Sequence, residues 1–475
     1  MPITRSTTKC AGTGRTGHDA LLVVGGARGE PGMKTVTIGG GQGFYGDGIA
    51  PVADLLAAGL DYVVFEGLAE LTLAILQKDR ARDESLGYTR DLPLYLGATL
   101  PYLVDGRTKV ITNAGGINPV AAGRAAVETL RQAGATGVRV ATVVGDDVLG
   151  RAGELGVDPG ALFANVYLGA RPIVQALEQG ADVVITGRVA DASLFLAPLV
   201  HEHGWAWDGW DRLAAGVVVG HLLECSGQVA GGNFSGAWWE NPDPLRVGFP
   251  YAEVGEDGAA VLTKAPGTGG MVTFDTVREQ LLYEVHDPSR YLNPDVSADF
   301  TTVTLVDRGG DRVEVSGATG REAPATYKGL ACTPAGWSAE VKLGYSWPDA
   351  EAKARSALRY VRQRAEALSI PVEEWWEEYF GVNAYGGPTV DLAAGDAAGW
   401  EPPEVIGRLA WRTGQPADAV RVFREVGVLG LSGPPSFAPV GRARDGKPSQ
   451  LLSVRPFFVE RSRVDRQVRV EVQTV

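Results

Sequence analysis

The chain has 475 residues, too many for one hydrophobic core, so its length predicts at least two domains. A formal net charge of −13, without any block of lysine or arginine, excludes a nucleic-acid-binding surface, and no apolar run is long enough to cross a bilayer. Cys10, Cys225 and Cys332 are widely spaced and match neither a disulfide framework nor a zinc site, which favours a reducing cytoplasm.

Three segments differ in composition. Residues 1–32 are rich in Thr, Gly and Arg and predict a disordered extension. Residues 33–240 predict an α/β domain. The glycines, tryptophans and prolines of residues 231–244 predict a domain edge, and residues 245–475 then predict an α+β domain.

Five apolar runs in the first half each end in glycine or a polar residue. The runs and the polar residues that follow them are Val36–Ile38 with Asp47, Tyr62–Phe65 with Glu66, Val110–Thr112 with Asn113, Val140–Val144 with Asp146, and Val183–Ile185 with Arg188. Apolar runs separated by helical segments predict a doubly wound parallel sheet of about five strands. Because the carboxyl ends of parallel strands meet at one edge, we expect these five polar residues to form a ligand site there.

Helices are predicted between these strands and in the second half. In the first half they cover residues 51–60, 69–82, 119–133, 172–179, 191–201 and 210–225. In the second half, Asp349–Ala367 and Glu404–Thr413 are predicted as helices, whereas residues 259–263, 300–306, 312–316, 339–343, 451–459 and 468–475 are predicted as strands.

The loop from Gly41 to Gly46 matches the G-x-G-x-x-G pattern of dinucleotide-binding folds, and Glu66 ends the next strand, where a ribose-binding acid would lie. Two features disfavour this interpretation. Pro51 predicts a helix that begins several residues after Gly46, and Asp47 places a negative charge where a pyrophosphate would bind. A purely structural glycine-rich turn is a third interpretation. We favour a loop that approaches a ligand closely and carries Asp47.

A series of motifs, in order along residues 34–337, resembles the acyclic terpene utilisation (AtuA) family. The motifs lie at residues 39–47, 65–74, 112–119, 185–193, 220–225, 231–234, 263–270, 280–284 and 287–288. The resemblance implies degradation of branched acyclic compounds, with acyl-thioester or small branched-acid chemistry. Phe44-Tyr45-Gly46 departs from the family, which more often has a serine before this glycine, so substrate preference is expected to differ if that serine is functional.

Carboxylates and one arginine form the predicted catalytic set. Glu66 and Glu70 are four residues apart, so one helical turn would place them side by side, and paired carboxylates suit acid–base catalysis. Arg188 is expected to clamp a substrate carboxylate, with Asp191 as its orienter or as a base. Asp47 is the alternative base. Helix caps and a structural ion pair are the alternative interpretations of these residues.

The predicted substrate-binding set is built around two loops. Asn113 and Asn118 flank a Gly115-Gly116 turn whose N–H groups suit an oxyanion, although a plain turn explains the sequence equally well. The loop of residues 263–272, with Lys264, lacks the Walker spacing and is expected to close the site from the second domain. The full set is Gly41, Gly43, Gly46, Asn113, Gly115, Gly116, Asn118, Asp146, Ser193, Asn233, Lys264, Thr268 and Gly269.

Two further groups of residues are weaker candidates for a functional site. Asp146 and Asp147, with Asp47, would suit Mg²⁺, but no spacing is diagnostic and no metal is predicted. His221 and Cys225 lie one helical turn apart, which suits thiolate activation, yet a buried structural cysteine is commoner.

The sequence therefore predicts a two-domain cytoplasmic enzyme that hydrates or eliminates on a branched carboxylate or acyl-CoA substrate. Glu66 or Asp47 would be the base, Arg188 the clamp, and the Asn113 turn the enolate stabiliser. No cofactor is predicted from a motif, and a CoA-linked substrate is one of the alternatives. The expected partner is a small-molecule substrate, with no nucleic acid or membrane, and a homo-oligomer or a small partner subunit stays open. An NAD-dependent dehydrogenase and a non-catalytic acyl-binding subunit are the rival interpretations.

Overall fold

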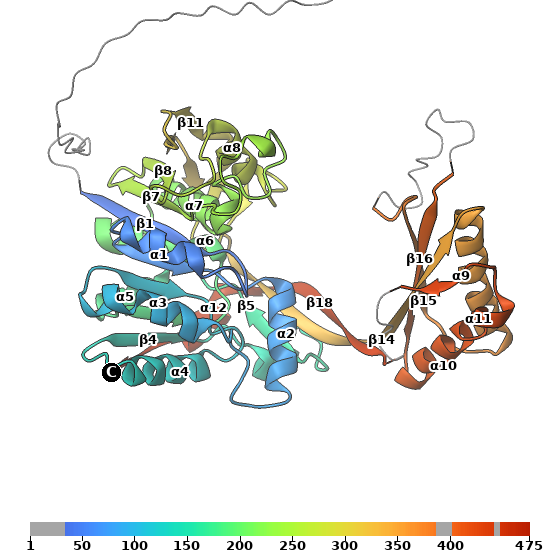
Figure 1. The fold of residues 1–475 in the computed structure, drawn as a ribbon. Helices are drawn as coiled ribbons and strands as arrows, with labels where there is room; N and C mark the ends of the chain where they lie inside the picture. The colour runs from blue at the N-terminus through green and yellow to red at the C-terminus, as the bar shows by residue number, and fades with distance from the viewer. Residues whose placement is uncertain (1–33, 386–400, 441–446) are drawn as a thin grey trace, which may run out of the picture. The chain divides into compact units, whose positions relative to one another are not determined.

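The structure, a computed structural model, describes residues 34–385, 401–440 and 447–475 (Figure 1). Residues 35–475 form one compact unit, whereas the predicted extension of residues 1–32 lies outside the described residues. No helix within these described ranges has both the length and the apolar character that a membrane span requires.

The five predicted strands are all present as neighbours in one sheet, and all are parallel. In spatial order they are β1 (Thr35–Gln42), β2 (Tyr62–Phe65), β3 (Lys109–Thr112), β6 (Val183–Thr186) and β4 (Arg139–Val144). Their carboxyl ends therefore lie at one edge of the sheet, as the sequence predicted.

The sheet is larger than predicted, because five antiparallel or outer strands extend it to ten and make it mixed. Beyond β1 come β7 (Pro250–Gly255), β8 (Ala260–Lys264), β12 (Val313–Ser316) and β11 (Thr304–Asp307); beyond β4 comes β19 (Arg469–Thr474). The prediction of a five-stranded sheet was thus wrong in size. The sheet also continues beyond residues 231–244, where the sequence predicted a domain edge. β7 follows that edge and pairs with β1, and β8 pairs with β7.

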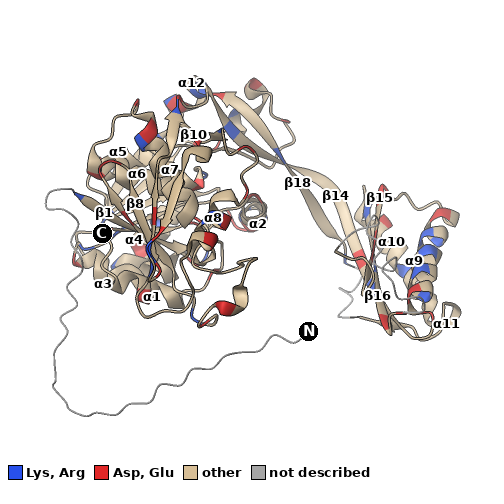
Figure 2. Cartoon of the chain, turned by 90° about the horizontal axis from the view of Figure 1, so that it is seen from above, with Lys and Arg blue, Asp and Glu red and all other residues tan. Residues whose placement is uncertain are grey.

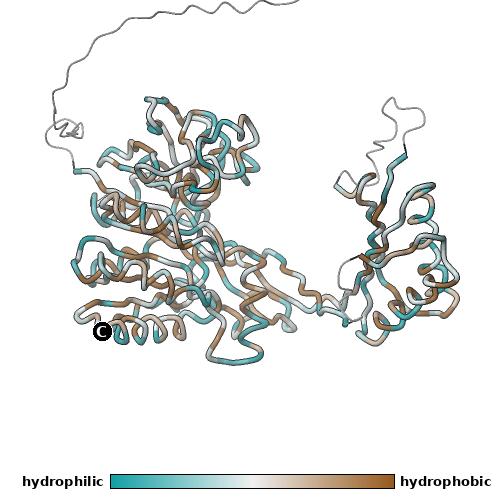
Figure 3. Tube along the Cα trace, in the orientation of Figure 1, coloured by the Kyte–Doolittle hydropathy of each residue, from teal (hydrophilic) through white to brown (hydrophobic). Residues whose placement is uncertain are grey.

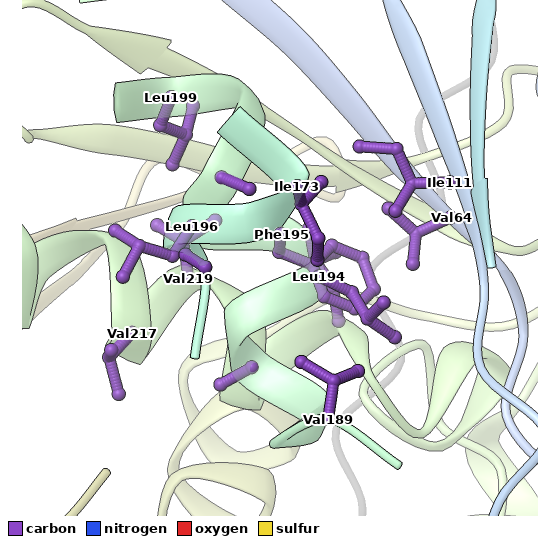
Figure 4. Packing of buried hydrophobic residues seen from close by; sticks show 14 of the residues in the cluster. Val64, Ile111, Ile173, Val189, Leu194, Phe195, Leu196, Leu199, Val217 and Val219 are labelled. Atoms are coloured by element: carbon purple, nitrogen blue, oxygen red, sulfur yellow. The ribbon is translucent and has the colours of Figure 1, made fainter. Parts of the chain in front are cut away.

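Helices cover both faces of the parallel strands (Figure 1). One face packs against α1 (Ala50–Ala57), α3 (Leu92–Val104) and α4 (Pro119–Gln132), and the other against α5 (Arg171–Glu178), α6 (Asp191–His203) and α7 (Trp210–Leu223). Hydrophobic residues recur along the strands (Figure 3), and on the α6 face Val64 and Ile111 share a core with Leu194 and Phe195 (Figure 4). Burial on both faces explains why these strands are continuously apolar.

The remaining elements form two smaller sheets and their helices. The six-stranded sheet comprises β15 (Glu374–Phe380), β16 (Glu404–Thr413), the long β14 (Thr326–Ser346), β17 (Ala438–Pro439), β18 (Ser449–Glu460) and β5 (Phe163–Val166). The three-stranded sheet comprises β13 (Thr319–Arg321), β10 (Ser297–Asp299) and β9 (Tyr291–Leu292). The other α-helices are α2 (Glu70–Arg80), α8 (Phe274–Leu282), α9 (Ala350–Ala367), α10 (Pro416–Val426), α11 (Leu429–Ser432) and α12 (Arg461–Val464). Short 3₁₀ helices cover Leu149–Leu155, Ser226–Gln228, Trp238–Glu240, Phe300–Thr302 and Asp465–Gln467.

One predicted helix is a strand. Residues 404–413 form β16, which pairs with β14 and β15, so the helix prediction there was wrong. The face of β16 that α9 and α10 cover buries Val405, Leu409 and Trp411. Even numbers of positions separate these residues, which is the alternation expected of a strand. Predicted helix α9 is confirmed, and its charged residues lie outside this core (Figure 2).

Candidate active site

Glu66, at the end of β2, lies at the centre of a buried polar cluster. Its Oε1 accepts hydrogen bonds from Leu68 N at 2.7 Å and from Asn113 Nδ2 at 2.6 Å. Asn113, at the end of β3, in turn accepts one from Gly67 N at 2.8 Å. The ends of two neighbouring strands are therefore joined through these side chains, and Glu66 is held in one orientation.

Arg188 follows β6 and is the buried cation of this cluster, with only 1% of its side chain exposed. It donates to Leu68 O at 2.6 Å, to Val189 O and to the Asp191 carboxylate. The face of its guanidinium lies 4.6 Å from the centre of the Tyr167 ring. Nearly all of its donors are thus used within the protein. A bidentate clamp on a substrate, as predicted for Arg188, would require these bonds to break.

Asp191 begins α6 and is the member of the cluster that reaches solvent, since 32% of its side chain is exposed. It is hydrogen-bonded to both Arg188 and Glu66. The carboxyl pair of the site is therefore Glu66 with Asp191, not Glu66 with Glu70 as the sequence predicted.

The two carboxyl groups have unequal environments. Burial raises the pKa of Glu66 well above its usual value, the Asp191 charge raises it further, and Arg188 and the Asn113 and Leu68 hydrogen bonds only partly oppose this. Burial also raises the pKa of Asp191, which Arg188 and the hydrogen bond from Glu66 lower. Both pKa values are raised, so the pair as a unit holds a proton to a higher pH than an ordinary carboxyl group does.

Glu70, the first residue of α2, lies at the exposed side of this cluster. It accepts a hydrogen bond from Tyr167 Oη at 2.9 Å and lies 3.8 Å from Lys328 Nζ on β14. Burial raises its pKa, but its backbone, Tyr167 and Lys328 together lower it, so Glu70 is ionised. Lys328 Nζ also lies over the Tyr167 ring, 5.0 Å from its centre. Sequence reasoning missed Tyr167 and Lys328, because neither follows a strand of the predicted sheet.

A comparison with known protein families covers all the residues of this site. A family model described as "Acyclic terpene utilisation family protein AtuA" matches residues 36–470. The chain belongs to the AtuA family. The match includes every residue of the cluster and confirms the resemblance read from the motifs. No curated protein and no solved structure matches significantly.

Asp146, which follows β4 of this AtuA chain, binds the backbone of Arg188. Its Oδ2 accepts hydrogen bonds from Arg188 N and Asn165 Nδ2, both at 2.8 Å, and the side chain is 2% exposed. A Cβ at Gly187 would collide with this carboxylate. Burial raises the pKa of Asp146 to about 6 despite these hydrogen bonds. Its position fits a role in holding the backbone of Arg188 rather than contact with a ligand.

Asp146→Asn is expected to make stability less dependent on pH. Because the folded pKa of about 6 exceeds the ordinary 3.8, the fold favours the protonated form, and wild-type stability falls as pH rises from 3.8 through 6. The asparagine keeps an acceptor but cannot ionise. Between about pH 5 and about pH 8 the wild type should lose on the order of 1–2 kcal/mol relative to the variant. Urea unfolding of both proteins at the two pH values measures this, and a pH-independent difference would contradict it.

The glycine-rich loop packs against the protein itself. A Cβ at Gly40 would collide with Leu223 O, and one at Gly43 would lie 2.8 Å from the Cys225 carbonyl carbon. Gly43 N donates to Asp47 Oδ2 at 3.0 Å, and Gly46 N donates to Asp91 Oδ2 at 3.0 Å.

These carboxylates occupy N–H groups that a pyrophosphate would need. The geometry therefore also disfavours the alternative dinucleotide-binding interpretation of this loop. Gly41 lies within β1 against Phe65, and Gly46 adopts a φ of 91° that favours glycine. Burial raises the pKa of Asp47, which the Gly43 and Gly48 N–H groups oppose, and the hydrogen bonds of Asp47 in the described structure go to Gly43, Phe44, Gly48 and Tyr95 rather than to the Glu66 cluster.

The turn after β3 also uses its N–H groups internally. Gly115 N donates to Thr186 O at 3.0 Å, and Gly116 N donates to Asn113 O at 3.1 Å. Asn118 caps α4 by accepting from Ala121 N and donates to the carbonyls of Glu84 and Leu86. The turn thus supports the site, and its donors do not face an oxyanion.

Lys264, Gly269 and Ser193, also predicted to bind substrate, bond to partners outside the cluster. Lys264 ends β8 and contacts Thr268 O at 2.8 Å and Asp311 at 3.2 Å, while Gly269 bonds to the backbone of Arg246 and Gly248. Asn233 lines a cavity of about 920 Å³ next to α8. Ser193 is buried on α6 and donates to Asp295 at 2.7 Å.

Cys225 and His221 do not form a thiolate pair. His221 Nδ1 lies 3.1 Å from Glu224 Oε1, and burial together with Glu224 raises the pKa of the Cys225 thiol. The neutral thiol is therefore favoured. Within residues 34–385, 401–440 and 447–475, no three His, Cys, Asp or Glu side chains are arranged to hold a metal ion.

Proposed function

We propose that the protein is an enzyme that adds or removes water on a branched substrate bearing a carboxylate or a CoA thioester, with Glu66 and Asp191 as its acid–base pair. The observation that carries this proposal is the hydrogen-bonded carboxyl pair, one member buried and one partly exposed, beside a buried arginine. Carboxyl groups with separated pKa values are suited to proton transfer near neutral pH.

Asp191 is the group that would contact the substrate. In elimination, its carboxylate would take the proton from the carbon next to the carbonyl. The protonated Asp191 would then return that proton to the departing hydroxide, so that water leaves and a carbon–carbon double bond forms. Hydration is the reverse. Glu66, through its shared proton, and Arg188, through its charge, would set the orientation and basicity of Asp191.

Lys328 would take the substrate-holding role first predicted for Arg188. Its ammonium lies over the Tyr167 ring, which Arg188 also contacts, and its side chain is 48% exposed. A single exposed ammonium can hold a carboxylate or a thioester-linked anion without breaking the buried arginine contacts.

Asp191→Asn is expected to lower turnover by about 10²–10⁴-fold while the fold is retained, because the amide cannot accept a proton. Branched carboxylates and their CoA thioesters are incubated with purified wild type, and mass spectrometry detects gain or loss of one water. The variant is then compared on whichever substrate reacts.

Glu128→Gln, on the exposed surface of α4, is the matched control and should keep full activity. Unchanged turnover in Asp191→Asn would refute the proposed role. NAD and NADP are titrated alongside, and a micromolar dissociation constant for either would favour a dehydrogenase. No turnover of any substrate, with tight binding of an acyl ligand, would favour a non-catalytic binding subunit.

A further inference from the structure

The end of α7 packs closely against the start of α6, the helix that Asp191 begins. A Cβ at Gly220 would collide with the carbonyl oxygen of Ala192, the residue after Asp191. Glu224 follows α7, and its N–H donates to Gly220 O at 2.8 Å, so it lies one helical turn beyond this contact and on the same side of α7. The close approach that Gly220 permits therefore brings Glu224 toward Asp191. Both Gly220 and Glu224 belong to the motif at residues 220–225, which has no part in the acid–base chemistry of Glu66 and Asp191.

His221 fixes the carboxylate of Glu224. Its Nδ1 lies 3.1 Å from Glu224 Oε1, and its side chain is buried, with the ring centre 5.5 Å from that of Tyr291 and 5.4 Å from that of Phe300. Nε2 of His221 is buried and has no hydrogen-bond partner among the residues that the structure describes. The ring hydrogen therefore belongs on Nδ1, where it donates to Glu224. The carboxylate is thus held by a side chain that is itself held in place.

The second oxygen of Glu224 has no partner. Oε2 is buried and accepts no hydrogen bond within residues 34–385, 401–440 and 447–475, and in the same ranges no lysine or arginine pairs with Glu224. A buried carboxylate oxygen without a donor or a cation acts strongly on neighbouring groups, because the surrounding protein screens its charge weakly.

Asp191 is one of the groups on which Glu224 acts. The charged and titratable groups that interact with Asp191 are Arg188 after β6, Glu66 after β2, Glu224 after α7, Tyr167 after β5 and Tyr291 on β9. Burial is the largest cause of the raised pKa of Asp191, Arg188 opposes it, and Glu224 raises this pKa further. Glu224 thus offsets part of the effect of the buried arginine.

We propose that Glu224, fixed by His221 at the end of α7, is a positioning residue that acts on the Asp191 carboxylate through its charge. The inference rests on the proposed function, in which Asp191 accepts the proton from the substrate. It explains how a carboxylate beside a buried guanidinium remains a good proton acceptor. Glu224 acts through Asp191 rather than by touching the substrate, since its unpartnered oxygen is buried.

The pH dependence of kcat tests the inference on whichever substrate the wild type converts. Glu224→Gln removes the charge and keeps an oxygen that can accept from His221. The acidic limb of the profile, where the carboxyl pair becomes protonated, should move to lower pH by about one unit, because Asp191 then loses its proton more readily. A merely structural Glu224 would change activity without moving this limb. Glu128→Gln, on the exposed surface of α4, is the matched control and should leave the limb in place.

Urea unfolding tests the same interaction without a substrate. Because the fold favours protonated Asp191, the wild type loses stability as pH rises from about 4 to about 8, and Glu224→Gln should make this loss smaller. In an Asp191→Asn background the substitution has no Asp191 carboxyl group to act on, so its effect on the pH dependence should be smaller. Comparing the two backgrounds also removes the contribution of the ionisation of Glu224 itself.

The two measurements separate failure of this inference from failure of the proposed function. If the wild type converts no substrate, the proposed reaction fails, and the unfolding comparison still decides whether Glu224 acts on Asp191. An unmoved acidic limb in Glu224→Gln, an equal shift in Glu128→Gln, or an equal change in pH dependence in both backgrounds would overturn the inference. If Glu224→Gln does not fold, Glu224→Met removes the charge without burying an amide donor and takes its place in both measurements.

Discussion

Glu66→Gln is expected to abolish turnover while leaving the fold intact. A glutamine oxygen can still accept from Leu68 N and Asn113 Nδ2, and its amide can still donate to Asp191. What is lost is the exchangeable proton that Glu66 shares with Asp191. Because Glu66 sets the basicity of Asp191, its loss should lower kcat by about the 10²–10⁴-fold that a general acid–base group such as Asp191 contributes.

Two measurements separate this role from a structural one. The melting temperature of Glu66→Gln should stay close to that of the wild type, and the pH dependence of kcat should lose the limb that the carboxyl pair produces. If Glu66 only capped a helix or turn, the variant would instead lose roughly 1 kcal/mol or less of stability and keep its activity. Unchanged turnover with a lower melting temperature would therefore leave Asp191 to act without Glu66.

Arg188→Met is expected to destabilise the protein by roughly 3–5 kcal/mol, because it removes one partner of a buried ion pair. The carbonyls of Leu68 and Val189 lose their donors, and Asp191 loses its countercharge next to Glu66. Urea unfolding measures the change. A substrate clamp on the surface would behave differently, with weaker substrate binding and little change in stability.

The double variant Arg188→Met with Asp191→Asn provides the control. With no carboxylate charge left beside it, the methionine should cost clearly less than it does alone, so the two changes should not be additive. Arg124→Gln, at an exposed position of α4, should change the free energy of unfolding by less than about 0.5 kcal/mol. A loss below about 1 kcal/mol in the single Arg188→Met variant would contradict the structural role.

The apolar runs predicted the five parallel strands and the edge at which Glu66, Asn113, Asp146 and Arg188 lie, whereas the fifth predicted residue, Asp47, is not bonded to this cluster. That prediction succeeded because strands buried on both faces have a simple sequence pattern, and because parallel strands place their ends together. Glu66, Asn113 and Arg188 were found in this way. Asp191, three residues after Arg188, was found from its spacing.

The partners of these residues could not be predicted, because they depend on side-chain directions and on distant segments. Glu70 faces Tyr167 and Lys328 instead of Glu66, and Lys328 comes from a strand about 260 residues later in the sequence. The glycines were misread for a related reason. A glycine that admits a ligand and one that admits a neighbouring helix have the same sequence signature.

The sheet that presents the site has an edge strand made from the far end of the chain. β19 pairs along all of β4 and bonds near Gly137 and Val138 through Val475. During synthesis, β4 therefore emerges long before β19 exists, and the backbone groups on that one edge lack their partner while more than 300 further residues are added. This edge of β4 is therefore open until β19 is made, and the strand that leads to Asp146 is paired on both sides only after β19 docks.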